Sequence, residues 1–275
     1  MTDDTALIRL LQDQPEKGFD AIHAAYGRKI YTLAYRMTGN REDAEDVTQE
    51  TFIQVIRYIG QFRGESALYT WVYTIARNQC HRLLKQRNKS SFASMESLLH
   101  SVGEMPKEPY PDRERRILLN QIKEGCLTGL LRCLPFSQRM AFILHVLLHL
   151  PVKEISKILR KSEGAVKVLV HRARRNLKTF LCRNCSLYDS SNPCRCENFI
   201  RFSLAQGWIQ QPAGEPWETV YDVSPEMIQA EIAEIRKVTE LYTSMAGPAF
   251  SETLHRHIRE MIQNQSRAIF LFKKV

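Results

Sequence analysis

Apolar side chains recur at helical spacing along most of the chain. In residues 5–90, and again in residues 113–180, they return every three or four positions, which is the period of an amphipathic helix. Gly39-Asn40 interrupts the first block and separates a predicted helix at 20–37 from a second at 41–59. Strand-like sequence is confined to the short end at 269–272. The pattern therefore predicts an all-α fold.

Stretches of different composition divide this helical sequence. Residues 91–112 combine Ser, Gly and Glu with three prolines and are predicted to form a flexible linker. Four cysteines follow in 182–206, and residues 207–225 are rich in Pro, Gly and Trp. Tail helices are predicted to begin at Ser224-Pro225-Glu226, which suits a helix start, and near Pro248. The expected parts are residues 5–90, 91–112, 113–181, 182–206 and 207–275.

The segment at 62–89 predicts a helix with one apolar and one polar face. The apolar stripe is predicted to comprise Leu68, Trp71, Val72, Ile75 and Ala76. The opposite face is predicted to carry Thr70, Thr74, Arg77, His81 and Lys85, with Tyr73 near the edge of the stripe. Aromatic rings beside cations suit unpaired bases, which stack on the rings while phosphates meet Lys and Arg. A surface helix with a solvated basic face is the alternative.

The predicted helix at 41–59 begins with a dense acidic run. Within ten residues, only Arg41 offsets the carboxylates Glu42, Asp43, Glu45, Asp46 and Glu50. A solvated helix face can explain such a run. In a basic protein that binds DNA, a surface that docks on another protein is the better interpretation, because charge sets the orientation and rate of association.

Two further predicted helices have the spacing of a helix-turn-helix. Pro151 opens the first, which ends at 159; the turn is 160–162, and the second helix spans 163–178. Its predicted buried positions are Val166, Leu169, Val170, Ala173 and Leu177. Residues 153–183 include ten Lys or Arg and two acidic residues, which suits a recognition helix in the major groove. A basic helix pair that binds nothing is the alternative.

Length and charge narrow the class of protein. The 275 residues, 44% of them hydrophobic, suffice for two or three small domains. We expect a cytoplasmic protein without membrane contact, because no apolar run could span a bilayer and the acidic N-terminus is unlike a signal peptide. The net charge is +9, yet residues 197–275 hold 10 acidic and 8 basic residues. Such a localised basic excess favours nucleic acid as a partner.

Seven cysteines in an intracellular protein are not expected to form a disulfide framework. Four of them have the pattern C-x2-C, eight residues, C-x-C, and could surround a thiophilic cation such as Zn or Cu: Cys182, Cys185, Cys194 and Cys196. Arg183 and Arg195 are predicted to favour their thiolate forms. A reversible redox pair and an incidental cluster are the alternatives. The other three, Cys80, Cys126 and Cys133, lack ligand spacing and are interpreted as small buried residues.

Two parts of the sequence resemble bacterial RNA polymerase sigma factors of the extracytoplasmic-function (ECF) type. The first match comprises the run at 43–52, Phe62–Ser66, Thr70-Trp71, Tyr73, Ile75–Asn78 and the basic run after Leu84. The second comprises Leu134-Pro135, Arg139, Glu154-Ile155, Ser162–Lys167 and His171–Arg174. The resemblance covers residues 5–180 and implies sigma region 2 at 5–90 and a helix-turn-helix sigma region 4 at 113–181, with a Cys-rich helical tail after them.

The resemblance also implies partners and the residues that contact them. Core RNA polymerase would dock on Asp43, Asp46, Gln49, Glu50 and Phe52. The −10 promoter element would be opened and held by Arg63, Ser66, Trp71, Tyr73, Arg77, Asn78, His81, Arg82 and Lys85. The −35 element would be read by Ser162, Glu163, Lys167, Val168, His171, Arg172 and Arg175. No catalytic residue is implied, so the chain is not expected to be an enzyme.

Some features depart from this family's pattern or extend it. Arg160 and Lys161 stand where the family usually has Gly and an apolar residue, and Val168-Leu169 stand where it often has Ser-Arg. The cysteine cluster resembles the tail of copper-responsive CorE-type sigma factors. That resemblance implies a built-in metal sensor that moves the tail between an inhibitory and a permissive pose. It leaves the metal open and does not exclude a separate anti-sigma factor.

Two other classes of protein compete with this interpretation. A one-component metal- or redox-sensing helix-turn-helix regulator would bind duplex DNA without polymerase, but it leaves the acidic run and the Trp71 helix unexplained. A cysteine-based redox enzyme would need a pocket, and no thioredoxin-like βαβ pattern surrounds the C-x2-C motif.

Overall fold

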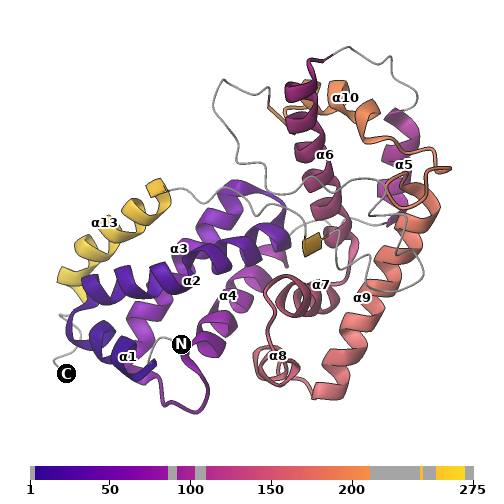
Figure 1. Ribbon diagram of the computed structural model, residues 1–275. Coiled ribbons are helices and arrows are strands. Elements are labelled where there is room, and N and C mark those ends of the chain that lie inside the picture. Colours follow the sequence, from indigo (N-terminus) through magenta and orange to yellow (C-terminus); the bar gives the residue numbers. More distant parts are fainter. Residues whose placement is uncertain (1–3, 86–91, 103–109, 211–241, 244–251, 270–275) are drawn as a thin grey trace. The chain divides into compact units, whose positions relative to one another are not determined.

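The chain folds into two compact helical units (Figure 1). The computed structural model describes residues 4–85, 92–102, 110–210, 242–243 and 252–269. Met1–Arg87, Leu150–Val166 and Gly247–Val275 form the first unit, and Asn88–His149 and Lys167–Ala246 form the second. All regular structure in the described ranges is helical apart from one isolated β-bridge, which confirms the predicted all-α class. None of the described helices is both long and apolar enough to cross a membrane.

The first unit is built around the long helix α2, Pro15–Thr38. The other elements are α1 (Asp4–Asp13), α3 (Arg41–Tyr58), the 3-10 turn Ile59–Gln61, α4 (Leu68–Leu84), α8 (Val152–Leu159), the start of α9 (Glu163–Asn184) and α13 (Glu252–Ile269). Gly39 ends α2 in the left-handed conformation, at φ 71°, and its N–H donates to the Tyr35 carbonyl. The Asn40 side chain then caps α3 by accepting from the Asp43 N–H. The predicted break at Gly39-Asn40 is confirmed.

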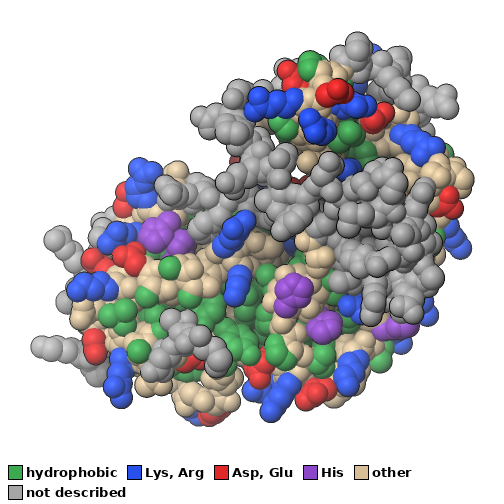
Figure 2. Space-filling view, viewed as in Figure 1, with side chains coloured by type: hydrophobic (Ala, Val, Ile, Leu, Met, Phe, Trp, Pro, Cys, Tyr) green, Lys and Arg blue, Asp and Glu red, His purple; other side chains and the backbone are tan. Residues whose placement is uncertain are grey.

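α2 contacts most of the other helices of the first unit. α1, α3 and α4 pack on it, while α8 lies against α4, and α13 lies against both α2 and α3. The centre of this packing is mostly apolar, with Phe19, Ile22, Ile30, Leu33 and Met37 of α2 inaccessible to solvent. Phe19 meets Phe52 of α3 edge-on, with 6.0 Å between ring centroids. Histidine and acidic side chains gather where α13 lies beside α2 (Figure 2).

The second unit has α6, Asp112–Cys133, as its longest undivided helix. Its other elements are α5 (Phe92–Val102), α7 (Phe136–Phe142), the π-turn Ile143–Leu147, α9 beyond Val166, the 3-10 turn Cys196–Phe199 and α10 (Ile200–Ala205). One apolar cluster joins α6 to the segment after the cysteines and comprises Leu118, Ile122, Ile200 and Ile209. Tyr242 packs edge-on against Phe142, and its hydroxyl donates to the Leu127 carbonyl at 3.1 Å.

Several element boundaries differ from those predicted. The interval 91–112, expected to be irregular, contains α5 at Phe92–Val102. Helix α9 runs six residues past the predicted end at 178 and so includes Cys182. The described part of the second tail helix, predicted from about Pro248, is α13. The helix predicted at Ser224, except Tyr242, and the irregular stretch 211–225 lie outside the described residues, as does 270–272 of the strand-like end.

Gly18 gives a test of the close approach of α1 and α2. A Cβ at this position would lie 2.5 Å from the Leu11 Cα and 2.7 Å from the Leu11 nitrogen. We expect Gly18→Ala to lower the free energy of unfolding by about 1–3 kcal/mol, because the clash is with backbone and outweighs the better helix propensity of Ala. Urea unfolding followed by circular dichroism measures this.

The control is Gly60→Ala in the same unit, where a Cβ would meet nothing within 4 Å. Equal stability of the two variants would show that the helices do not approach so closely.

Candidate nucleic-acid interface

The buried face of α4 is not the predicted one. The buried side chains are Leu68, Thr70, Val72, Tyr73, Ala76 and Cys80, whereas Trp71 and Ile75 are only half-buried. Placing Thr70 on the exposed face and Tyr73 at the edge of the apolar stripe was therefore wrong. The physical reason is that α4 is covered by three helices, α2, α3 and α8, so a single apolar stripe does not describe its contacts.

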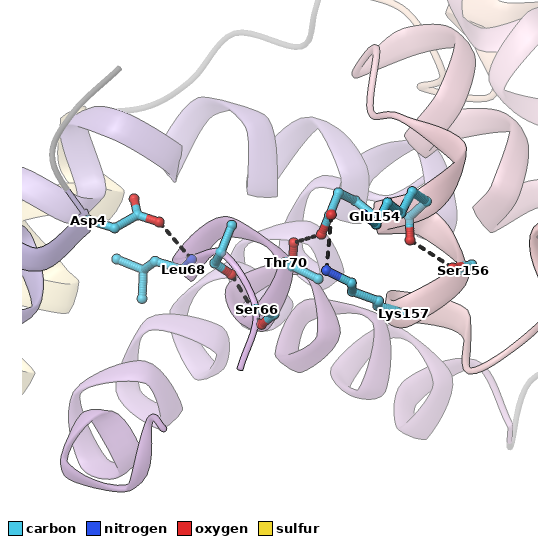
Figure 3. A network of polar contacts seen from close by, with 9 residues as sticks. Asp4, Ser66, Leu68, Thr70, Glu154, Ser156 and Lys157 are labelled. Atoms are coloured by element: carbon cyan, nitrogen blue, oxygen red, sulfur yellow. Dashed lines mark hydrogen bonds and ion pairs between the residues drawn. The ribbon is translucent and has the colours of Figure 1, made fainter. Parts of the chain in front are cut away.

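A polar network holds the first turn of α4 (Figure 3). The Thr70 hydroxyl donates to Glu154 Oε2 of α8 at 2.6 Å, and Lys157 Nζ donates to Oε1 of the same carboxylate at 3.1 Å. Ala67 stands at the N-cap position of α4, and its methyl group cannot accept a hydrogen bond. Asp4 of α1 supplies the cap instead, by accepting from the Leu68 N–H at 2.9 Å. The hydrogen bond from Thr70 lowers the pKa of Glu154, with Lys157 adding to the effect and partial burial opposing it.

Most of the residues predicted to bind the −10 element remain accessible. Asn78, His81, Arg82, Lys85 and Arg63 are exposed, and Ser66, Trp71 and Arg77 are half-buried. Phe62 packs beside Trp71 with 5.3 Å between ring centroids, and Arg77 donates to the Asn78 side chain at 2.8 Å. Tyr73 is the exception: it is 2% exposed, and burial raises its pKa above the ordinary value. In this packing its ring cannot stack on a base.

Helix α9 presents the predicted −35 face to solvent. Its N-terminus is capped by the Ser162 hydroxyl, which accepts from the Ala165 N–H at 3.2 Å. Every residue predicted to read the −35 element is exposed: Ser162, Glu163, Lys167, Val168, His171, Arg172 and Arg175. Val168 is 46% exposed, which is unusual for a large apolar side chain in this protein. Of the predicted buried stripe, Leu169 alone is only half-buried.

The turn before α9 keeps a left-handed residue without using glycine. Arg160 has φ 52° and ends α8, and the N–H of Lys161 donates to the Ser156 carbonyl at 3.0 Å. Glycine is favoured in this conformation because other residues bear a cost of about 1–2 kcal/mol. The departure seen in the sequence at Arg160 therefore leaves the conformation of the turn intact.

The predicted polymerase-docking residues on α3 divide into surface and core. Asp46 is exposed, and Gln49 and Glu50 are half-buried, whereas Asp43 is 7% exposed and Phe52 is fully buried. Phe52 packs against Phe19 and against His23, whose ring lies 5.3 Å away. The prediction that Phe52 and Asp43 contact a partner does not fit this packing, because Phe52 belongs to the core around α2. The surface that remains comprises Asp46, Gln49 and Glu50.

The cysteines of the tail come together with one that the sequence did not single out. Cys185 and Cys194 pair in the isolated β-bridge, and Cys196 packs on the cluster that contains Ile122 of α6. Cys126 lies one turn after Ile122 and interacts electrostatically with all three of these thiols. Cys182 instead interacts with Tyr188, whose pKa is raised to about 12, mainly by burial. Because Cys126 is 56 positions before Cys182, no spacing motif could reveal it.

Burial disfavours the thiolate form at three of the tail cysteines. Burial raises the pKa of Cys194 to about 11 and that of Cys196 to about 12, and it also raises the pKa of Cys185. At Cys194 the charge of Arg195 lowers the pKa, as predicted, but burial raises it and is the larger effect. Within the described part of the chain, no three His, Cys, Asp or Glu side chains are placed so that they could hold a metal ion. The metal site predicted from the four tail cysteines therefore stays a prediction, and metal binding would require these thiols to move.

Thr70→Val tests the network at α4. We expect the pKa of Glu154 to rise toward its ordinary value, because the variant removes the hydrogen bond that lowers it most. The contribution of this carboxylate to stability, present above its ordinary pKa and lost as pH falls through the lowered one, should shrink accordingly. Carbon-13 NMR titration of the glutamate carboxyls measures the pKa. Thr70→Ser, which keeps the hydroxyl, should behave as wild type; identical Glu154 titration in all three proteins would contradict the contact.

Comparison with known proteins shows the family to which the chain belongs. Residues 22–90 match Sigma-70 region 2, and residues 124–177 match Sigma-70, region 4. The RNA polymerase sigma-H factor of Pseudomonas aeruginosa is 30% identical over 174 residues, which cover 62% of this chain and 90% of that protein. The ECF RNA polymerase sigma-E factor of Haemophilus influenzae is 30% identical over 175 residues, which cover 62% and 91%. The structure of CnrH in complex with the cytosolic domain of CnrY has a TM-score of 0.48 at 19% identity, covering 65% of this chain and 97% of that one. The chain belongs to the ECF sigma factors of the sigma-70 family.

Proposed function

We propose that this sigma factor directs promoter-specific transcription by docking core RNA polymerase on α3, holding the −10 element with α4 and reading the −35 element with α9. The observation that carries the proposal is the face of α9, where six of the predicted −35 residues are exposed on one continuous helix and the seventh, Ser162, is exposed just before it. Such a helix can place side chains at base edges in the major groove while its remaining cations meet phosphates.

The side chains along α9 differ in the DNA groups that they can contact. Lys167, Arg172 and Arg175 supply positive charge for phosphates or guanine edges, and the exposed Val168 can pack on a thymine methyl group. His171 lies between these cations in sequence and can donate or accept. Contacts to phosphate release counterions, so promoter binding should weaken steeply as salt is raised.

Helix α4 supports the proposal through its C-terminal half. Asn78, His81, Arg82 and Lys85 are all exposed there, and no acidic residue lies on α4. A single strand of DNA could follow this surface with its phosphates, while Trp71 offers a half-exposed ring for a base. Tyr73 would contribute only after α4 repacks.

Transcription with purified core RNA polymerase on a library of bacterial promoters tests the proposed function. We expect initiation to require this protein, and Lys167→Ala and Arg172→Ala each to reduce it several-fold, in line with about 1–3 kcal/mol for a good base contact. Each variant should also lower the salt dependence if its contact is to phosphate.

Lys17→Ala is the control: it removes the same single positive charge, at an exposed position of α2. This variant should leave initiation unchanged. Duplex binding without any polymerase-dependent transcription would favour the one-component regulator instead.

We propose separately that thiophilic metal acts on the tail through its thiols. Support comes from the gathering of Cys126, Cys185, Cys194 and Cys196 in one part of the second unit. Because the thiols are half-buried, have raised pKa values and are not arranged as ligands, binding would have to release protons and rearrange the segment.

Titration of the reduced protein with Zn(II) or Cu(I) alone tests this. We expect proton release and thiolate-to-metal absorbance, both abolished by the double substitution of Cys194 and Cys196 by Ser, and polymerase-dependent transcription of that variant should no longer respond to metal. Single variants at Cys126 and Cys182 distinguish the two candidate ligand sets. Loss of absorbance in Cys182→Ser but not in Cys126→Ser would support the set predicted from spacing. Transcription that still tracks metal in the double variant would contradict metal control by these thiols.

A further inference from the structure

The C-terminal helix α13 is packed onto the first unit by an apolar face. Leu254 is 5% exposed and Ile258, one turn later, is fully buried. The helices that α13 lies against are α2 and α3 (Figure 1). This helix follows both segments that match the sigma-70 family, 22–90 and 124–177, and is supplied by the tail.

Polar contacts fix where α13 sits on α2. His255 Nδ1 lies 2.7 Å from His23 Nδ1, and His255 Nε2 lies 3.2 Å from Asp20 Oδ1. Arg259 completes the set through its ion pair with the other oxygen of Asp20, at 3.2 Å. A hydrogen bond between two ring nitrogens needs one donor and one acceptor, so at least one of the two imidazoles must be neutral.

The contacts of α13 extend to the surface of α3 that remains for polymerase. Gln49 Nε2 donates to Met261 Sδ at 3.1 Å. Gln49 is one of the three predicted docking residues that are not in the core. In α3, Asp46 precedes it by about one turn and Glu50 follows it directly. A partner that bound the Gln49 side chain would have to break its hydrogen bond with Met261.

We propose that α13 and core RNA polymerase compete for the α3 surface around Gln49, so that the docked tail helix lowers the affinity of this sigma factor for polymerase. The inference rests on the proposed docking role of α3. It identifies the occupant of that surface in the free protein as residues 252–269 of the same chain. If the undocked form makes up about 1–10% of molecules, apparent affinity for polymerase is reduced about 10- to 100-fold.

Ile258→Asp in the full-length protein is the principal test. The variant places a charge on the buried face of α13, so the helix should undock. Hydrogen exchange of residues 252–269 by mass spectrometry should become faster, and affinity for core RNA polymerase, measured by fluorescence anisotropy, should rise about tenfold or more. Arg256→Asp, an exposed change on the same helix, is the matched control and should alter neither quantity.

A charge swap gives a second, milder test. Arg259→Asp should loosen α13. Adding Asp20→Arg should restore part of its protection and of the lower affinity, because the ion pair is re-formed in reverse while the contact of Asp20 with His255 is lost. The expected change is only about two- to fivefold, since the pair is partly exposed.

The outcomes distinguish failure of the proposed competition between α13 and polymerase from failure of the proposed sigma function. Faster exchange of α13 with unchanged polymerase affinity would overturn the competition and leave the sigma function standing. Absence of polymerase binding by every variant would overturn both. Unchanged exchange in Ile258→Asp would overturn the packing of α13 itself.

Acidification is a third readout of the same contact. Burial lowers the pKa of His23 from 6.5 to about 4, with His255 adding to the effect and Asp20 opposing it; Phe52, the neighbour from α3, is uncharged. Stability from the neutral imidazole is therefore present above pH 6.5 and is lost as the pH falls from there toward 4. NMR titration should find His23 near 4 in the wild type and closer to 6.5 in Ile258→Asp. A His23 pKa that is the same in both proteins would show that α13 does not cover this residue.

Discussion

Burial of α2 is the constraint on which the first unit depends. This helix is covered by α1, α3, α4 and α13, and its inward side chains are inaccessible to solvent. Each covering helix gives most of its apolar positions to that core and leaves most of its charged residues for the surface. The exposed carboxylate of Asp46 and the exposed cations at the end of α4 are therefore placed by packing on α2 or its neighbours, and not by interactions of their own.

The number of neighbours explains where residue-level prediction failed. α9 buries one stripe with little deviation, and there the predicted faces agree with the structure. α4 has three neighbours, so polar Thr70 is buried beside apolar side chains and needs a partner. Glu154 provides it across 84 residues of sequence. The same reasoning places Phe52 in the core, because the acidic run on α3 sits on a helix that also packs on α2.

The thiols show a conflict between local charge and burial. Arginines beside cysteines favour thiolates when the side chains are in water, whereas removal from water favours the neutral thiol. Packing of the Cys196 turn on α6 makes the second effect larger, and it brings Cys126 into the group. A metal ion that binds this cluster must therefore offset the free-energy cost of ionising the thiols as well as the cost of rearranging the segment that carries them.

The sequence by itself determined the helical class, the break at Gly39-Asn40, the exposed face of α9 and the resemblance to sigma factors, because each rests on local periodicity, capping or a contiguous motif. Only the tertiary structure decided that Tyr73 is buried, that Cys126 joins the tail thiols, and that α13 lies on α2 and α3. These are contacts between residues tens to hundreds of positions apart. No local pattern encodes them, because burial of one helix depends on which others are packed against it.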